Sequence, residues 1–84
     1  MSEAPKSKAT GPVEALSVVL PAYNEEANIE RVVRQVAAYL DPLGIDYEIL
    51  PVNDGSRDRT GEILDELAAA DPRVRVIHFS RNFG

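Results

Sequence analysis

Short apolar runs alternate with apolar residues at helical spacing along this chain, and their order constrains the fold more than any other feature. Residues 16–20 read L-S-V-V-L and stop at Pro21, which predicts a strand buried on both faces. Between residues 29 and 40 the apolar positions recur three and four apart, as on one buried face of a helix. Asn24 is the expected N-cap of this helix, with two acidic residues in its first turn.

The same alternation repeats in the second half of the chain. Residues 47–52 predict a second strand, followed by the turn-forming segment N-D-G-S. A second helix is expected from about Asp58, with Ser56 or Asp58 as its cap, and residues 74–79 predict a third strand. Pro51 cannot donate to a neighbouring strand, so we expect it at a bulge or where that donor is not needed.

The predicted order is strand, helix, strand, helix, strand, which belongs to the α/β class. Each connection is long enough for a right-handed crossover between parallel strands, so we expect a Rossmann-like parallel sheet. A chain of 84 residues has room for one small domain at most. We expect a disordered tail over residues 1–14. Because the chain stops after the third predicted strand, we expect residues 15–84 to be a partial domain, an amino-terminal fragment.

Composition excludes several classes of protein. The chain has no cysteine, which excludes a disulfide scaffold, a zinc ribbon and a thiol nucleophile, and favours a cytoplasmic setting. Its formal net charge of −5 disfavours binding to a nucleic-acid backbone, because such binding needs clustered Lys and Arg. The longest apolar run, residues 15–22, is far shorter than the roughly 20 residues that span a bilayer.

Two polar segments follow the first two predicted strands. Residues 21–26 (P-A-Y-N-E-E) come after the first strand, and residues 53–58 (N-D-G-S-R-D) come after the second. Because the carboxyl ends of parallel strands share one edge of a sheet, we expect both segments to form one ligand site. The ring of Tyr23 offers a flat face to a nucleobase or ribose, and an ionised Asp54 can accept hydrogen bonds from ring N–H groups of uracil or guanine.

The sequence lacks the common glycine-rich loops that bind phosphate through backbone N–H groups. Neither G-x-G-x-x-G nor G-x-x-x-x-G-K-[ST] occurs in it. A bound diphosphate would then need another source of positive charge, usually a divalent cation held by carboxylates. No D-x-D sequence occurs in these residues.

These polar residues also have purely structural interpretations. Asp54 and Gly55 alone are typical of a tight turn. Glu26 is interpreted as an ordinary acid in the first turn of a helix, and Glu25 as a candidate ligand contact. Asp58 is more typical of a helix cap than of a metal ligand. Arg57 and Arg59 are interpreted as solvated side chains. His78 is interpreted as a structural residue, because a metal site would need more ligands than one.

Three motifs in order resemble one family. P-A-Y-N-E-E after the first strand, V-N-D-G-S-x-D-x-T after the second and S-R-N-F-G after the third are similar to the start of a family 2 glycosyltransferase. The sequence most resembles the branch that transfers sugars to dolichyl or polyprenyl phosphate, over about residues 16–84. The resemblance implies the nucleotide-sugar-binding half of a GT-A fold, which would be incomplete in this chain.

The resemblance also implies roles for individual residues. The nucleoside pocket would be lined by Pro21, Ala22, Tyr23 and Glu25, with Val52 and Asp54 contacting the base and Ser56 nearby. The segment that leads into the next helix of the family is matched by Arg81, Asn82 and Gly84. Pro51 departs from the family, which more often has an apolar strand residue at this position.

The remaining parts of the family's site lie further along than residue 84. The D-x-D metal site and the catalytic and acceptor-binding residues fall there, so the resemblance implies no catalytic residue and no metal ligand within this chain. For the whole enzyme it implies Mg²⁺ or Mn²⁺, a UDP- or GDP-sugar donor, a lipid-phosphate acceptor and association with a membrane.

The favoured hypothesis is therefore a truncated inverting glycosyltransferase that binds a nucleotide-diphosphate sugar. One alternative is a non-catalytic α/β fragment that acts only as a binding or interaction module through its exposed sheet edge. A second alternative is a domain like the phosphorelay receivers. That chemistry needs an acidic pair at the end of the first strand, where this chain has P-A-Y.

Overall fold

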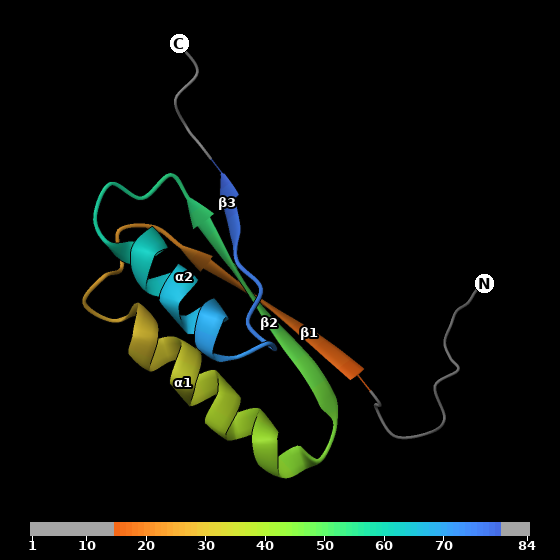
Figure 1. The fold of residues 1–84 in the computed structure, drawn as a ribbon. Helices are drawn as coiled ribbons and strands as arrows, with labels where there is room; N and C mark the ends of the chain where they lie inside the picture. The colour runs from red at the N-terminus through yellow and green to blue at the C-terminus, as the bar shows by residue number, and fades with distance from the viewer. Residues whose placement is uncertain (1–14, 80–84) are drawn as a thin grey trace, which may run out of the picture.

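A computed structural model describes residues 15–79 of the chain (Figure 1). Three strands and two α-helices alternate along it, with a short 3₁₀ helix after the first α-helix. Their bounds are β1 Ala15–Ala22, α1 Ile29–Leu40, η2 Asp41–Leu43, β2 Asp46–Asp54, α2 Thr60–Ala70 and β3 Ile77–Phe79. The tail predicted over residues 1–14 lies outside the described residues, as do Arg81, Asn82 and Gly84.

The three strands form one parallel sheet in the order β1-β2-β3. β1 pairs with β2 along its whole length, from Ala15 opposite Asp46 to Ala22 opposite Asn53. β3 pairs with residues 52–54 at the end of β2. The predicted α/β class and the Rossmann-like parallel arrangement are confirmed.

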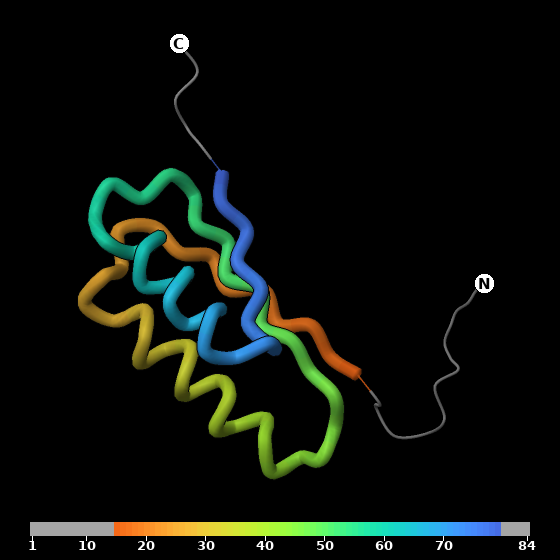
Figure 2. The backbone as a smooth tube through the Cα atoms, viewed as in Figure 1, coloured from red at the N-terminus to blue at the C-terminus, as the bar shows by residue number. Residues whose placement is uncertain are grey.

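Both helices lie on the same face of the sheet (Figures 1 and 2). The side of β2 that packs against them is buried along its length and consists of Tyr47, Ile49, Pro51 and Asn53. Ile49 is fully buried and belongs to one cluster with Leu64 of α2 and Val33 of α1. The core is therefore a single layer between one face of the sheet and the two helices.

The other face of the sheet carries no helix within the part of the chain that the structure describes, and it exposes apolar side chains beside the hydrogen-bonded Ser17 and Glu48. Val19, Ile77 and Phe79 are 60%, 41% and 57% exposed. β1, at the edge of the sheet, is exposed over its first three residues and at Val19 and Pro21, and only Ala22 is buried. The prediction that this strand is buried on both faces is wrong, because two successive crossovers of the same hand bring both helices to one face.

Both helices begin later than predicted. α1 begins at Ile29, so Asn24 is not its N-cap, and the two acidic residues after Asn24 lie in the loop and not in the first helical turn. α2 begins at Thr60 and not at Asp58, although the Asp58 carboxylate does accept a hydrogen bond from the Thr60 N–H at 2.9 Å. The polar residues before each helix instead bond across to the neighbouring loop, as described below.

Pro51 explains why the third strand is shorter than predicted. Ile49 donates to the Arg73 carbonyl at 2.8 Å and accepts from the Arg75 N–H at 2.9 Å, so its peptide groups face the β3 side. Pro51 lies two residues further on and faces the same side. It has no N–H to donate, and pairing is interrupted between an isolated bridge at Val74 and β3. Residues 74–79 are therefore not one continuous strand.

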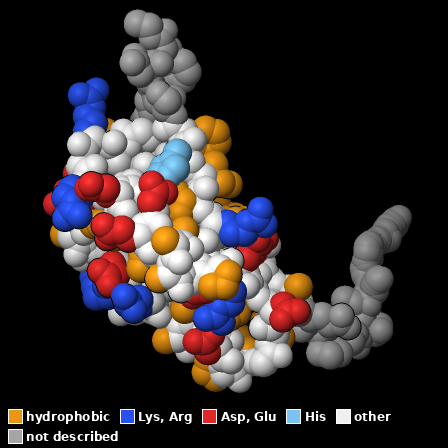
Figure 3. Space-filling view, in the orientation of Figure 1, with side chains coloured by type: hydrophobic (Ala, Val, Ile, Leu, Met, Phe, Trp, Pro, Cys, Tyr) orange, Lys and Arg blue, Asp and Glu red, His pale blue; other side chains and the backbone are white. Residues whose placement is uncertain are grey.

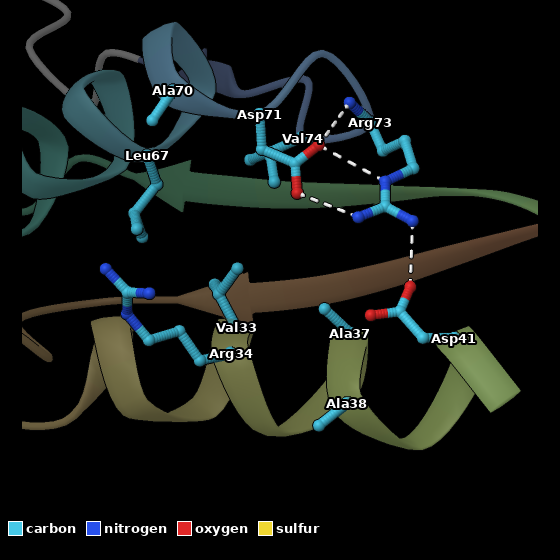
Figure 4. A pocket seen from close by; sticks show the side chains of 10 residues that line it. All are labelled: Val33, Arg34, Ala37, Ala38, Asp41, Leu67, Ala70, Asp71, Arg73 and Val74. Atoms are coloured by element: carbon cyan, nitrogen blue, oxygen red, sulfur yellow. Dashed lines mark hydrogen bonds and ion pairs between the residues drawn. The ribbon is translucent and has the colours of Figure 1, made fainter.

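At the amino end of the sheet, Arg73 ties the ends of the two helices together (Figure 4). Its guanidinium lies 2.8 Å from Asp41 and 3.2 Å from Asp71, and 4.5 Å from the centre of the Tyr47 ring. Hydrogen bonds from Tyr47 and Arg73 lower the pKa of Asp41, while burial and the bond to Asp41 raise the pKa of Tyr47 to about 12. These acids and Arg73 help to line a hollow of about 510 Å³ between α1 and α2.

Acidic and basic side chains are mixed over the face that carries the helices (Figure 3). Arg34 pairs with Glu30 along α1, and Arg59 pairs with Glu62 at the start of α2, each at 2.8 Å. Neither helix in residues 15–79 has the length and apolar character needed to cross a membrane.

The buried position of Leu64 leads to a stability prediction. We expect Leu64→Ala to lower the free energy of unfolding by about 2–5 kcal/mol, because the truncation leaves a cavity at a fully buried site. Leu43→Ala is the control, since Leu43 is 55% exposed, and should cost less than about 1 kcal/mol. Urea denaturation followed by circular dichroism measures both. Equal losses would contradict the position of Leu64 in the core.

Candidate functional site

The two predicted polar segments lie side by side at the carboxyl edge of the sheet. Ala22 is the last residue of β1, and it pairs with Asn53, which precedes the last residue of β2. Tyr23 directly follows Ala22, and Asp54 directly follows Asn53, so both residues lie at the same level at this edge. The structure thus brings together segments that are about 30 residues apart in sequence, as the parallel sheet requires.

Asn24 makes the first link between the two loops. Its N–H donates to Ser56 Oγ at 2.9 Å, and its side-chain Oδ1 accepts from the N–H of Arg57 at 2.8 Å. Asn24 has a φ of 52°, in the left-handed region that asparagine tolerates better than most residues. The loop after β1 is thus turned back at Asn24 and fastened to the loop after β2.

Glu26 makes a second link of the same kind. Its N–H donates to Asp58 Oδ2 at 3.1 Å, and its carboxylate Oε1 accepts from the N–H of Arg59 at 3.0 Å. Between these two links, the N–H of Glu25 donates to the hydroxyl of the fully buried Thr60 at 2.7 Å. Five hydrogen bonds in which one partner is a backbone N–H therefore hold the loops in a fixed relative position.

The Asp58 carboxylate connects both loops to the start of α2. Its Oδ1 accepts from the N–H and the hydroxyl of Thr60, and its Oδ2 accepts from Glu26. Burial raises the pKa of Asp58, but the hydrogen bonds from Thr60 and Glu26 outweigh burial and keep this pKa below its usual 3.8. Asp58 is not the N-cap of α2, which is Arg59, but its carboxylate still holds the first residue of this helix and the loop after β1.

The seven predicted site residues differ in how much of them a ligand can reach. Tyr23 is 46% exposed, and Glu25 and Asp54 are also exposed at the edge. Ser56 is half-buried between the loops, with its hydroxyl bonded to Asn24 and its N–H bonded to Asn53 Oδ1 at 3.1 Å. The others lie at the strand ends, where Pro21 is exposed and pairs with the half-buried Val52, and Ala22 is only 2% exposed.

Sequence reasoning missed several residues that build this edge. Asn24 and Glu26 were assigned to the start of a helix, and no role was predicted for Asn53 or Thr60. His78 was assigned no role, yet its ring lies 3.0 Å from the Asn53 amide and 2.8 Å from the Asp65 carboxylate. The polar composition of both segments was a usable signal, but these partners lie 13 to 35 residues apart and share no local pattern.

Across residues 15–79, no three His, Cys, Asp or Glu side chains lie close enough together to hold a metal ion.

A parallel α/β sheet with polar loops clustered at its carboxyl edge is the usual setting of a nucleotide-binding site. Residues 17–84 match the family model described as Glycosyl transferase family 2. Because the match covers more than half of the chain, this chain belongs to glycosyltransferase family 2.

Curated relatives are similar over the same region. An uncharacterized glycosyltransferase, YkcC, of Bacillus subtilis is 50% identical over 68 residues, which are 81% of this chain and 21% of YkcC. An undecaprenyl-phosphate 4-deoxy-4-formamido-L-arabinose transferase of Pseudomonas fluorescens is 36% identical over 74 residues, which are 87% of this chain and 22% of that protein. The chain thus spans about one fifth of the length of these relatives.

The bonds to Asp58 lead to a prediction about pH. The folded-state pKa of Asp58 is lowered, so its stabilising contribution is present above about pH 3.8 and is lost as the pH falls through the folded-state pKa. We expect Asp58→Asn to destabilise the chain at about pH 7, because asparagine has only one side-chain oxygen and its N–H₂ group would face the donors of Thr60 or the N–H of Glu26. The difference from the unmodified chain should shrink at about pH 2.5.

Urea denaturation at the two pH values measures this effect. Asp46→Asn is the matched control, because Asp46 is exposed at the first residue of β2, at the opposite edge of the sheet from Asp58. A difference between Asp58→Asn and the unmodified chain that stays the same at both pH values would show that the Asp58 carboxylate does not act in this way.

Proposed function

We propose that this chain supplies the nucleoside-binding edge of a glycosyltransferase that uses a UDP- or GDP-sugar as donor. Support comes from membership of family 2, from the relatives named as undecaprenyl-phosphate sugar transferases, and from the two linked loops at the carboxyl edge. In the whole protein the acceptor is a polyprenyl or dolichyl phosphate, which associates the enzyme with a membrane.

One observation carries this proposal: an aromatic ring and a carboxylate are exposed at the ends of adjacent strands whose loops are fixed to each other. The ring of Tyr23 gives the base or ribose a flat surface to pack on. The Asp54 carboxylate accepts hydrogen bonds from the ring N–H groups that uracil and guanine present, whereas adenine lacks a ring N–H at the equivalent position. The edge therefore suits a uridine or guanosine nucleotide.

The remaining predicted residues support these two contacts. Pro21 and Val52 pair at the ends of β1 and β2 and form the floor on which the base rests. Ser56 holds the loop after β2 in place, while Ala22 packs beneath the loops in the core. Glu25 lies at the rim and contacts the ribose. Transfer itself, and the Mg²⁺ or Mn²⁺ that would bind the diphosphate, belong to the whole protein.

Calorimetric titration tests nucleotide binding directly. The folded chain is titrated with UDP, GDP and ADP, each with and without Mg²⁺, after circular dichroism has shown that the chain is folded. We expect UDP or GDP to bind more tightly than ADP. Equal binding of all three, or no heat at millimolar nucleotide with a folded chain, would overturn the proposal.

The role of Asp54 predicts a loss of affinity in Asp54→Asn. Charge-assisted hydrogen bonds are worth about 1.5–3 kcal/mol, so the affinity for the preferred nucleotide should fall about tenfold to about 100-fold. Asp46→Asn removes a carboxylate from the opposite end of the same strand and should leave the affinity unchanged. Similar losses in both variants would point to a general effect of net charge and not to a contact with the base.

The role of Tyr23 predicts a separate loss in Tyr23→Ala. Stacking of a base on an aromatic ring is worth about 1–3 kcal/mol, so we expect the affinity to fall about fivefold or more. Tyr39 is 74% exposed on α1, away from this edge, and Tyr39→Ala is the matched control. Nucleotide binding that survives Tyr23→Ala unchanged would rule out stacking on this ring.

A further inference from the structure

A buried amide stands directly before the proposed base contact. Asn53 is only 8% exposed and immediately precedes Asp54 in β2. Its Oδ1 accepts the N–H of Ser56 at 3.1 Å, and its Nδ2 lies 3.0 Å from Nδ1 of His78. Since the Ser56 N–H can only donate, the amide oxygen must point toward Ser56 and the amide N–H₂ toward His78. Asn53 thereby closes the turn that carries Asp54, Gly55 and Ser56.

This arrangement fixes the protonation state of the imidazole. Nδ1 of His78 must accept from Asn53, so it carries no proton. Nε2 lies 2.8 Å from Asp65 Oδ1 and carries the ring proton, because an ionised carboxylate can only accept. The hydrogen bonds thus form a chain from Asp65 in α2 through His78 in β3 to Asn53 in β2, and they require a neutral ring.

The side chains of Asn53 and His78 pack tightly against α2 at Gly61. A Cβ atom built on Gly61 of α2 would lie 2.8 Å from Asn53 Nδ2 and 3.5 Å from His78 Cε1. Glycine is less favourable in a helix than alanine. At this position it lets α2 approach closely enough for Asn53 and His78 to meet.

Protonation of His78 would disrupt this contact. A proton on Nδ1 would face the Asn53 N–H₂ group, and a rotated amide would instead turn its N–H₂ toward the Ser56 N–H. One of the two hydrogen bonds of Asn53 is lost in either case. Among the described groups around the ring, α2 contributes the charged Asp65 and β2 contributes the neutral Asn53.

We propose that His78 is a positioning residue that holds the Asp54–Ser56 turn through Asn53, and that nucleotide binding weakens when His78 is protonated. The binding part of this inference rests on the proposed function. The positioning part does not, because the hydrogen bond between Asn53 and Ser56 is present in the chain without a nucleotide.

The first experiment follows the turn without any nucleotide. His78 is the single histidine of the chain, so its ring signals in an NMR titration from about pH 8 to about pH 5 are unambiguous. We expect the backbone amide signals of Gly55 and Ser56 to shift with the same midpoint as the His78 ring. In His78→Asn, whose side-chain oxygen replaces the acceptor but does not titrate, these shifts should be absent. Amide signals that do not follow the ring would overturn the proposal.

The second experiment measures the affinity for UDP and GDP in the same pH range. We expect about three- to tenfold weaker binding at low pH in the unmodified chain, and a similar loss at all pH values in His78→Phe. His78→Asn should recover most of that loss and remove the pH dependence. Equal affinity and equal pH dependence in all three proteins would overturn the coupling to binding.

The two experiments separate failure of the proposal from failure of the proposed function. If neither UDP nor GDP binds the folded chain, the proposed function fails, and the NMR titration alone decides whether His78 positions the turn. Circular dichroism checks that His78→Phe is folded. Should it not fold, the comparison of the unmodified chain with His78→Asn still decides both questions.

Discussion

The parallel pairing of β1 with β2 is the constraint on which the rest of this structure depends. It runs from Ala15 opposite Asp46 to Ala22 opposite Asn53, and so brings both strands to the same edge at the same level. Only then can the N–H of Asn24 reach Ser56 and the N–H of Glu26 reach Asp58. A ligand at this edge would meet loops that are already ordered, which reduces the entropic cost of binding.

The order of elements and the meeting of the two polar loops could be predicted because the signals for both are local. Apolar spacing identifies each strand and helix from its own residues, and parallel topology then determines which loops meet. The helix starts could not be predicted in this way. Asn24 and Asp58 read as caps, but Asn24 bonds to the loop after β2, and Asp58 bonds both to its own helix and to the loop after β1.

The contacts of His78 were beyond sequence reasoning for the same reason. Its partners Asn53 and Asp65 lie 25 and 13 residues away, and nothing near His78 in the sequence indicates them. Pro51 was the opposite case, because this residue alone was enough to predict irregular strand pairing. The sequence indicated that a backbone donor would be missing, and the structure shows that the missing donor falls on the β3 side.

The two edges of the sheet are stabilised by different chemistry. At the amino edge, Arg73 is surrounded by Asp41, Asp71 and the ring of Tyr47, so charge is neutralised within the protein. At the carboxyl edge, the links between the loops use backbone N–H groups, and Asp54 and Tyr23 stay exposed to solvent. Charged side chains therefore hold the amino edge together, whereas hydrogen bonds to backbone N–H groups hold the loops of the carboxyl edge.

The interruption at Pro51 also has a consequence for motion. The segment that ends in β3 is attached to β2 at an isolated bridge at Val74 and again where β3 pairs with residues 52–54, with a break between the two attachments. Segments with few backbone hydrogen bonds open at a lower free energy than the rest of a fold. β3 can therefore detach locally while β1 and β2 stay paired. His78 lies in this segment, so each such opening would release the turn before Ser56 without unfolding the sheet.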